Sequence, residues 1–170
     1  METELTLEIL GSHKGFPPFS ARGCVQTLEP IPQGELHRTV NGDLVLVGGY
    51  RETKYRSKIT CKDKQGIALG GVIIGAPVRV GCIQRLVESV EAKKDKYLLK
   101  YNPVEGSIYF ISESGMRIQL EGGREIALSL DHGVGYLSYR PTIEMRITSY
   151  KLETDEWGMT VGWALDCEEI

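Results

Sequence analysis

The stretch WGMTVGWALDC, residues 157–167, decides the fold, because large apolar residues recur in it at every second position. Successive side chains of a β-strand point to opposite faces of a sheet, so a period of two predicts a strand with one buried face. The predicted inward residues are Trp157, Met159, Val161, Trp163, Leu165 and Cys167. This pattern assigns both tryptophans and one cysteine to packing.

Residues 142–152 precede this strand and repeat its pattern. The predicted inner residues are Ile143, Met145 and Ile147, and the predicted outer residues are Glu144, Arg146, Thr148 and Tyr150. The polar residues 153–156 supply the reversal between the two segments. Together they predict a long C-terminal hairpin whose apolar faces meet the same core.

Shorter strand-like segments, separated by glycine-rich turns, run through the rest of the chain. Residues 55–62 and 78–83 alternate most clearly, and further strands are predicted at residues 5–9, 23–28, 36–40, 44–47, 97–101, 107–111, 117–120 and 125–130. Residues 86–96 have some helical potential, but three apolar positions do not establish a helical stripe. The regular spacing predicts an all-β fold, either an antiparallel β-sandwich or a small barrel.

A chain of 170 residues fits a single domain with a sizeable core. We therefore predict one β domain over residues 1–170, in which residues 1–22 form an N-terminal strand and an arm. The arm is residues 11–22, which contain Gly15, Pro17 and Pro18 and have the composition of a loop.

Charge and hydropathy argue against two classes of partner. Twenty basic and twenty-three acidic residues give a net charge of −3, so nucleic acid is not expected as the main partner. No apolar stretch approaches the roughly 20 residues of a membrane span, so membrane insertion is not expected. The start, Met1 to Glu4, lacks the basic and apolar regions of a secretory signal, so we expect the protein to be made in a cytoplasm.

Residues that could carry catalysis are sparse. The three histidines lack metal-site spacing, and neither a phosphate loop nor a dinucleotide motif occurs, so we expect no metal, no cofactor and no enzymatic activity. Asp131 and His132 could orient Ser129 or Ser138 as a nucleophile. However, Asp-His-Gly is also a common turn sequence, and adjacent residues in a turn rarely have triad geometry, so the turn is favoured.

The four cysteines form no CxxC pair, and we expect them to be reduced. Cys61, Cys82 and Cys167 follow apolar residues in the predicted strands and are interpreted as core residues, whereas the pattern leaves Cys24 unassigned.

Tyr136 and Tyr139 follow the glycines at positions 133 and 135, and surface display there would provide a platform for stacking a sugar or a base.

Three segments, YRSKITCKD (55–63), VRVGCIQRL (78–86) and YRPTIEMRITSYKLETDEWGMTVGWALDCEE (139–169), resemble small β-rich structural proteins encoded among the virion genes of tailed bacteriophages. The resemblance covers about half of the chain. It implies a non-enzymatic component of the tail, baseplate or neck that forms homo-oligomers, binds other virion proteins and resides in the virion. It carries over no catalytic residue.

On this hypothesis, copies assemble into a ring or tube with closed cyclic symmetry, because exposed strand edges and loops can pair between subunits. The expected contacts are residues 11–22 and the loop around Gly122 and Gly123. The alternative is a carbohydrate-binding or hydrolytic β protein acting on the cell envelope, which would need a cleft lined by Tyr136, Tyr139 and acidic side chains.

Overall fold

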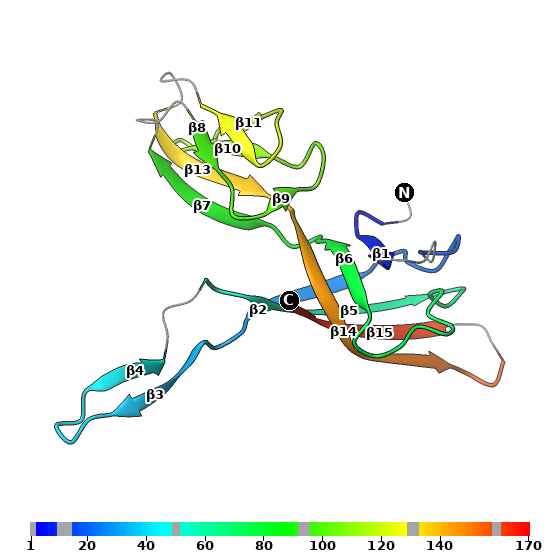
Figure 1. Ribbon diagram of the computed structural model, residues 1–170. Helices are drawn as coiled ribbons and strands as arrows, with labels where there is room; N and C mark the ends of the chain where they lie inside the picture. Colours follow the sequence, from blue (N-terminus) through cyan, green and yellow to red (C-terminus); the bar gives the residue numbers. More distant parts are fainter. Residues whose placement is uncertain (1–2, 10–14, 49–51, 92–95, 129–132, 158–160) are drawn as a thin grey trace.

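The computed structural model describes residues 3–9, 15–48, 52–91, 96–128, 133–157 and 161–170 (Figure 1). These residues form antiparallel strands and no helix, which confirms the all-β prediction, and the described sheets do not close into a barrel. No membrane-spanning helix is found among them. The strands are β1 (Thr6–Ile9), β2 (Val25–Pro30), β3 (Gly34–Arg38), β4 (Leu44–Gly48), β5 (Tyr55–Asp63), β6 (Pro77–Gly81), β7 (Leu86–Glu91), β8 (Lys96–Leu98), β9 (Asn102–Pro103), β10 (Tyr109–Ser112), β11 (Arg117–Gln119), β12 (Glu125–Ala127), β13 (Val134–Tyr139), β14 (Pro141–Thr154) and β15 (Val161–Glu169).

The larger sheet has the strand order β1-β6-β14-β15-β5-β2, and β9 pairs with the start of β14. The predicted hairpin, β14–β15, lies at its centre. Ile143, Met145 and Ile147 of β14 are buried with Leu165 and Cys167 of β15, as their alternation predicts. The sheet curls around this core, so that β2 comes close to the end of β6. The backbone N of Ile83, just beyond β6, donates a 2.7 Å hydrogen bond to the side-chain oxygen of Gln26 in β2.

The prediction that Tyr150 lies on the outer face is wrong. The register of β14 against β15 shifts between Ile147 and Ser149, which leaves Thr148 as an extra residue in the ladder. Such a bulge reverses the alternation beyond it. Tyr150 therefore pairs with the buried Leu165 and packs half-buried against the core.

The assignment of Trp157 to the core is also wrong, because this side chain is 84 % exposed. β14 continues to Thr154, so the reversal occupies the positions that follow and Trp157 lies in the turn rather than in a strand. β15 begins at Val161. The inward placement of Trp163 is confirmed, whereas Met159 lies outside the described residues.

A second lobe, at the top of Figure 1, contains a four-stranded sheet of order β11-β10-β13-β7 and the two-stranded pair β12–β8. It has its own core of apolar residues that includes Val90, Phe110 and Leu137. Residues 86–91 and 96–98 are strands, which agrees with the absence of a helical stripe, whereas β13 was not predicted. Tyr101 packs against both cores and so joins the two lobes.

The described part of the predicted arm, residues 15–22, lies against the larger sheet. The Phe16 ring stacks on Trp163 with centroids 5.8 Å apart, and the indole Nε1 of Trp163 donates a 2.7 Å hydrogen bond to the carbonyl of Ser20. These contacts anchor residues 15–22 to the protein's own core. Residues 10–14 lie outside the described part of the chain.

Candidate functional site

The β3–β4 hairpin projects from the body of the molecule, away from both lobes (Figure 1). Its root is held by a 2.7 Å hydrogen bond from the backbone N of Ile31 to the carbonyl of Lys54. Five large apolar side chains along the hairpin are between 40 % and 64 % exposed: Leu36, Leu44, Val45, Leu46 and Val47. Val40 at the tip is fully exposed. Single exposed apolar residues are ordinary, but a contiguous group of this kind marks an interaction surface.

The register of the hairpin divides these side chains between two faces. Leu36 pairs with Leu46 and Arg38 with Leu44, so three leucines share one face. His37 pairs with Val45 and Glu35 with Val47, which places two valines on the opposite face, where the His37 ring contacts Glu35 at 3.1 Å. Each face therefore carries exposed apolar side chains, and no described residue buries either face.

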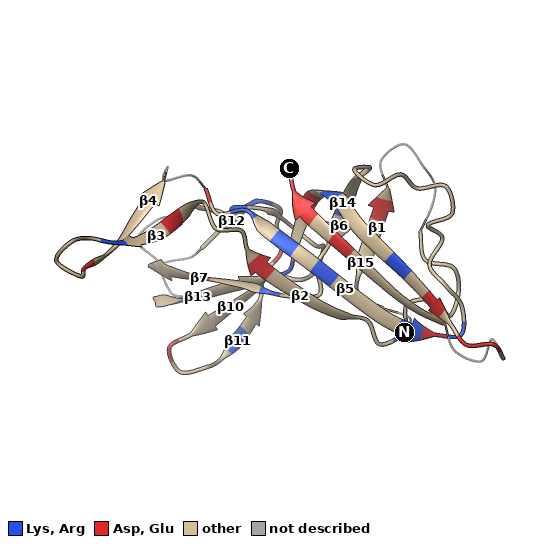
Figure 2. Cartoon of the chain, turned by 90° about the horizontal axis from the view of Figure 1, so that it is seen from below, with Lys and Arg blue, Asp and Glu red and all other residues tan. Residues whose placement is uncertain are grey.

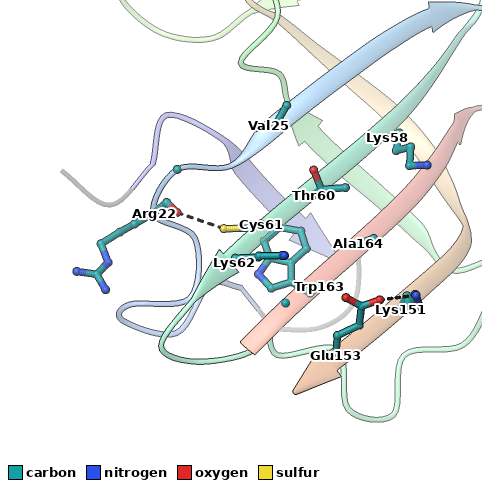
Figure 3. Close-up of a pocket in the computed structure, with 12 residues that line it drawn as sticks. Arg22, Val25, Lys58, Thr60, Cys61, Lys62, Lys151, Glu153, Trp163 and Ala164 are labelled. Atoms are coloured by element: carbon teal, nitrogen blue, oxygen red, sulfur yellow. Dashed lines mark hydrogen bonds and ion pairs between the residues drawn. The ribbon is translucent and has the colours of Figure 1, made fainter. Parts of the chain in front are cut away.

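A shallow hollow of about 650 Å³ lies on the outer face of the larger sheet, over β2, β5, β15 and β14 (Figure 3). Its lining includes the small residues Thr60, Gly162 and Ala164. Its charged lining residues are Arg22, Lys58, Lys62, Lys151 and Glu153, and Lys151 and Glu153 form an ion pair. Arg22 is paired with Asp63 and Lys151 with Glu153, so the excess positive charge of this hollow comes from Lys58 and Lys62.

The rest of the same face carries charges that neutralise one another. Basic residues on β5 lie beside acidic residues on β15 (Figure 2), and Arg56 contacts Glu168 at 2.7 Å. On the opposite side of β14, Arg79 bridges Glu8 and Glu144 at 3.0 and 3.1 Å. Exposed pairs of this kind contribute little to stability. They cover the sheet with a polar surface that contrasts with the apolar hairpin.

Tyr139 does not form an exposed platform with Tyr136. Its side chain is fully buried, and its hydroxyl donates a 2.9 Å hydrogen bond to Glu88, which also accepts a 2.9 Å bond from Tyr97. Burial, followed by the contact with Glu88, raises the pKa of Tyr97 to about 12 and also raises the pKa of Tyr139. Because β13 alternates, Tyr136 points to the opposite side and is 48 % exposed. Tyr136 and Tyr139 therefore lie on opposite faces of β13 and do not line one cleft, which the glycan-binding alternative needed.

A second phenol–carboxylate contact lies where the lobes meet. The Tyr101 hydroxyl is 3.0 Å from one Glu169 oxygen, and that oxygen also accepts a 2.8 Å hydrogen bond from the backbone N of Tyr55. Burial and Glu169 raise the pKa of Tyr101. The Lys100 ammonium lies 4.9 Å from the Tyr101 ring centre and 5.5 Å from that of Tyr55. This cluster links the C-terminal strand to the smaller lobe.

Of the residues considered for a catalytic triad, the structure describes only Ser138. Ser129, Asp131 and His132 lie outside the described residues. Ser138 is buried, and its hydroxyl accepts a 2.8 Å hydrogen bond from Arg85. The described residues contain no group of three or more histidine, cysteine or acidic side chains placed to hold a metal ion.

The assignment of three cysteines to the core is confirmed. Cys61, Cys82 and Cys167 are buried, and burial raises their pKa values to about 12, 11 and 12 respectively. Thiols with such pKa values are almost entirely protonated at neutral pH, so they react slowly there and faster as the pH rises. Cys24 is half-buried against the same core.

Sequence reasoning located the strands of the projecting hairpin but not its exposure. The signal was present: in LVLVG, residues 44–48, apolar residues occupy consecutive positions, so whichever face is inward the other is also apolar.

A scan against protein-family models and a search of curated proteins found no match for this chain.

Proposed function

We propose that this protein is a non-enzymatic structural subunit of a tailed-phage virion, and that its copies assemble with one another and with other virion proteins into a ring or tube of the tail, baseplate or neck. The phage context rests on the sequence resemblance of residues 55–63, 78–86 and 139–169. The assembly function rests on the projecting β3–β4 hairpin.

The hairpin is the observation that carries the proposal. A two-stranded hairpin is marginally stable by itself in water, and this one has no described layer over either face. Complete burial of an exposed leucine or valine is worth roughly 1.5–3 kcal/mol, so each half-exposed residue here would contribute about 1 kcal/mol in a contact. Contact with another subunit would therefore stabilise both the complex and the hairpin.

The position of the hairpin favours a head-to-tail contact between copies. Because it extends from one end of the molecule, it would reach a different surface on the next subunit, and repeated contacts of that type close into a ring or continue as a tube. The outer strands of both sheets, β1, β2, β7 and β11, offer further edges on which a subunit could add a strand.

The test measures the mass of the purified full-length protein by light scattering over a range of concentrations, with electron microscopy of the same samples. We expect a discrete oligomer that dissociates when Leu36 and Leu46, which pair on one face, are both replaced by serine. The matched control replaces Ile73 and Ile74, which are similarly exposed but lie outside the hairpin, and should retain the oligomer. A wild-type protein that stays monomeric at all concentrations would refute the proposal, and equal dissociation of both variants would refute the role of the hairpin.

A further inference from the structure

Cys24 and Cys61 lie opposite each other at one end of the β2–β5 ladder. The last pair at that end is Val25 with Thr60, and continuing this antiparallel register by one residue places Cys24 opposite Cys61. Residues directly opposite each other in antiparallel strands point to the same face. Consistent with this, Cys61 belongs to the core of the larger sheet and Cys24 packs against that core.

Hydrogen bonds place the two sulfur atoms at the same turn. The thiol of Cys24 donates to the carbonyl of Ala21 at 3.1 Å. The thiol of Cys61 donates to the carbonyl of Arg22 at 3.3 Å, and Figure 3 shows this second bond. Because these carbonyls belong to consecutive residues, both sulfurs occupy one small region beside the turn that precedes β2. The two thiols are close enough for each to affect the pKa of the other.

This arrangement matches the requirements of a disulfide bond. Cα atoms of directly opposed residues in antiparallel strands are about 4.5–5.5 Å apart, and disulfides span Cα distances of about 4.4–6.8 Å. The other two cysteines do not have this relationship. Cys82 follows β6 and Cys167 lies in β15, and β14 runs between those two strands.

We infer that Cys24 and Cys61 form a latent disulfide site, reduced when the protein is made and closed by a small-molecule disulfide. Cys24 reacts first because it is the more exposed thiol. Its thiolate attacks one sulfur of the small disulfide, displaces the first small thiolate and forms a mixed disulfide. The Cys61 thiolate then attacks the Cys24 sulfur and displaces the second small thiolate. The two protein thiols lose two protons and two electrons, and the oxidant becomes two small thiols.

The bond would close the loop from residue 24 to residue 61, which contains the whole β3–β4 hairpin. A crosslink stabilises a protein mainly by restricting the unfolded chain, and a loop of this size in a protein of this length implies a rise in Tm on the order of 10 °C. Oxidation would thus stabilise the sheet from which the hairpin extends without altering the exposed apolar residues of the hairpin.

The test incubates the full-length protein with bis(2-hydroxyethyl) disulfide at pH 8.5, followed by non-reducing peptide mapping by mass spectrometry and a thermal melt. The expected product is a single intrachain Cys24–Cys61 bond with the loss of two hydrogen atoms and a raised Tm that dithiothreitol reverses. Cys24→Ser should abolish both changes, whereas the matched variant Cys82→Ala should still form the bond. Peptide mapping of the wild-type protein tests the inference even if a variant fails to fold.

Three results would overturn the inference: a different intrachain pairing, a mixed disulfide at Cys24 that persists while Cys61 stays available for alkylation, or no oxidation at all. The pH dependence is a second readout. Burial raises the pKa of both thiols, so the fraction of thiolate, and with it the rate of closure, should increase about tenfold per pH unit between pH 7 and 8.5. A rate that does not change with pH would also contradict this route.

Discussion

Arg22 and Asp63 form a two-pronged ion pair that fastens the segment before β2 to the end of β5. The guanidinium Nη2 and Nε of Arg22 lie 2.6 and 3.1 Å from the same carboxylate oxygen of Asp63, and the backbone N of Arg22 donates to the other oxygen at 2.9 Å. The Asp63 side chain is buried, so these contacts replace its hydration. This pair holds the turn beside Cys24 in place.

Asp63→Asn should remove a contribution to stability that depends on pH. The hydrogen bond from Arg22 holds the pKa of Asp63 far below its usual range, whereas in the unfolded chain this pKa is about 3.9. A lowered folded-state pKa stabilises the protein above the unfolded value, and this stabilisation is lost as pH falls toward the folded value. The gap in Tm between wild type and variant should therefore be constant from pH 5 to 8 and shrink below pH 4.

Thermal melts at several pH values measure this gap. Asp43→Asn, at the exposed tip of the hairpin, provides the control and should differ little from wild type throughout. An Asp63→Asn deficit that is as large at pH 3 as at pH 7 would show that packing, rather than ionisation, sets the effect.

Replacement by phenylalanine should destabilise the protein at Trp163 but not at Trp157. Trp163→Phe deletes the buried hydrogen bond to the Ser20 carbonyl and part of the stacking on Phe16, which should destabilise the protein by about 1–3 kcal/mol. Trp157→Phe changes an exposed turn residue and should stay within about 0.5 kcal/mol of wild type. Urea unfolding measures both variants. If Trp157→Phe lost more unfolding free energy than Trp163→Phe, the exposed position of Trp157 would be contradicted.

A second matched pair tests the burial of Tyr139. Tyr139→Phe leaves one oxygen of Glu88 without its partner inside the smaller lobe, so we expect a loss of about 1–3 kcal/mol. Tyr136→Phe, three positions away on the other face of β13, should be nearly neutral. Equilibrium unfolding again provides the measurement, and equal effects would argue against the buried phenol–carboxylate contact.

Gly135 should tolerate no side chain. A methyl group there would lie 2.5 Å from the carbonyl oxygen of Ile111 and 2.5 Å from the ring of Phe110, so Gly135→Ala should destabilise the protein by about 1–3 kcal/mol. Gly123→Ala is the control, because a methyl group there meets no atom within 4 Å. Comparable stability of the two variants would show that β10 and β13 can separate at low cost.

Local alternation predicted the central strands, because it depends on nothing beyond the period of an extended backbone. Ile143, Met145 and Ile147 and the stripe from Trp163 to Cys167 are inward for this reason. The same reasoning failed where the chain departs from regular geometry. The bulge after Ile147 turns Tyr150 inward, and the long reversal exposes Trp157, yet neither changes the apparent period of the sequence.

The sequence by itself therefore determined the β class, the strands of the C-terminal hairpin and the burial of three cysteines. Tertiary structure decided which surfaces are covered. It placed Tyr139 in a second core, brought Cys24 opposite Cys61 and left the β3–β4 hairpin exposed. The physical reason is that a periodic pattern specifies the two faces of a strand, whereas the layer that packs on each face is supplied by residues distant in the chain.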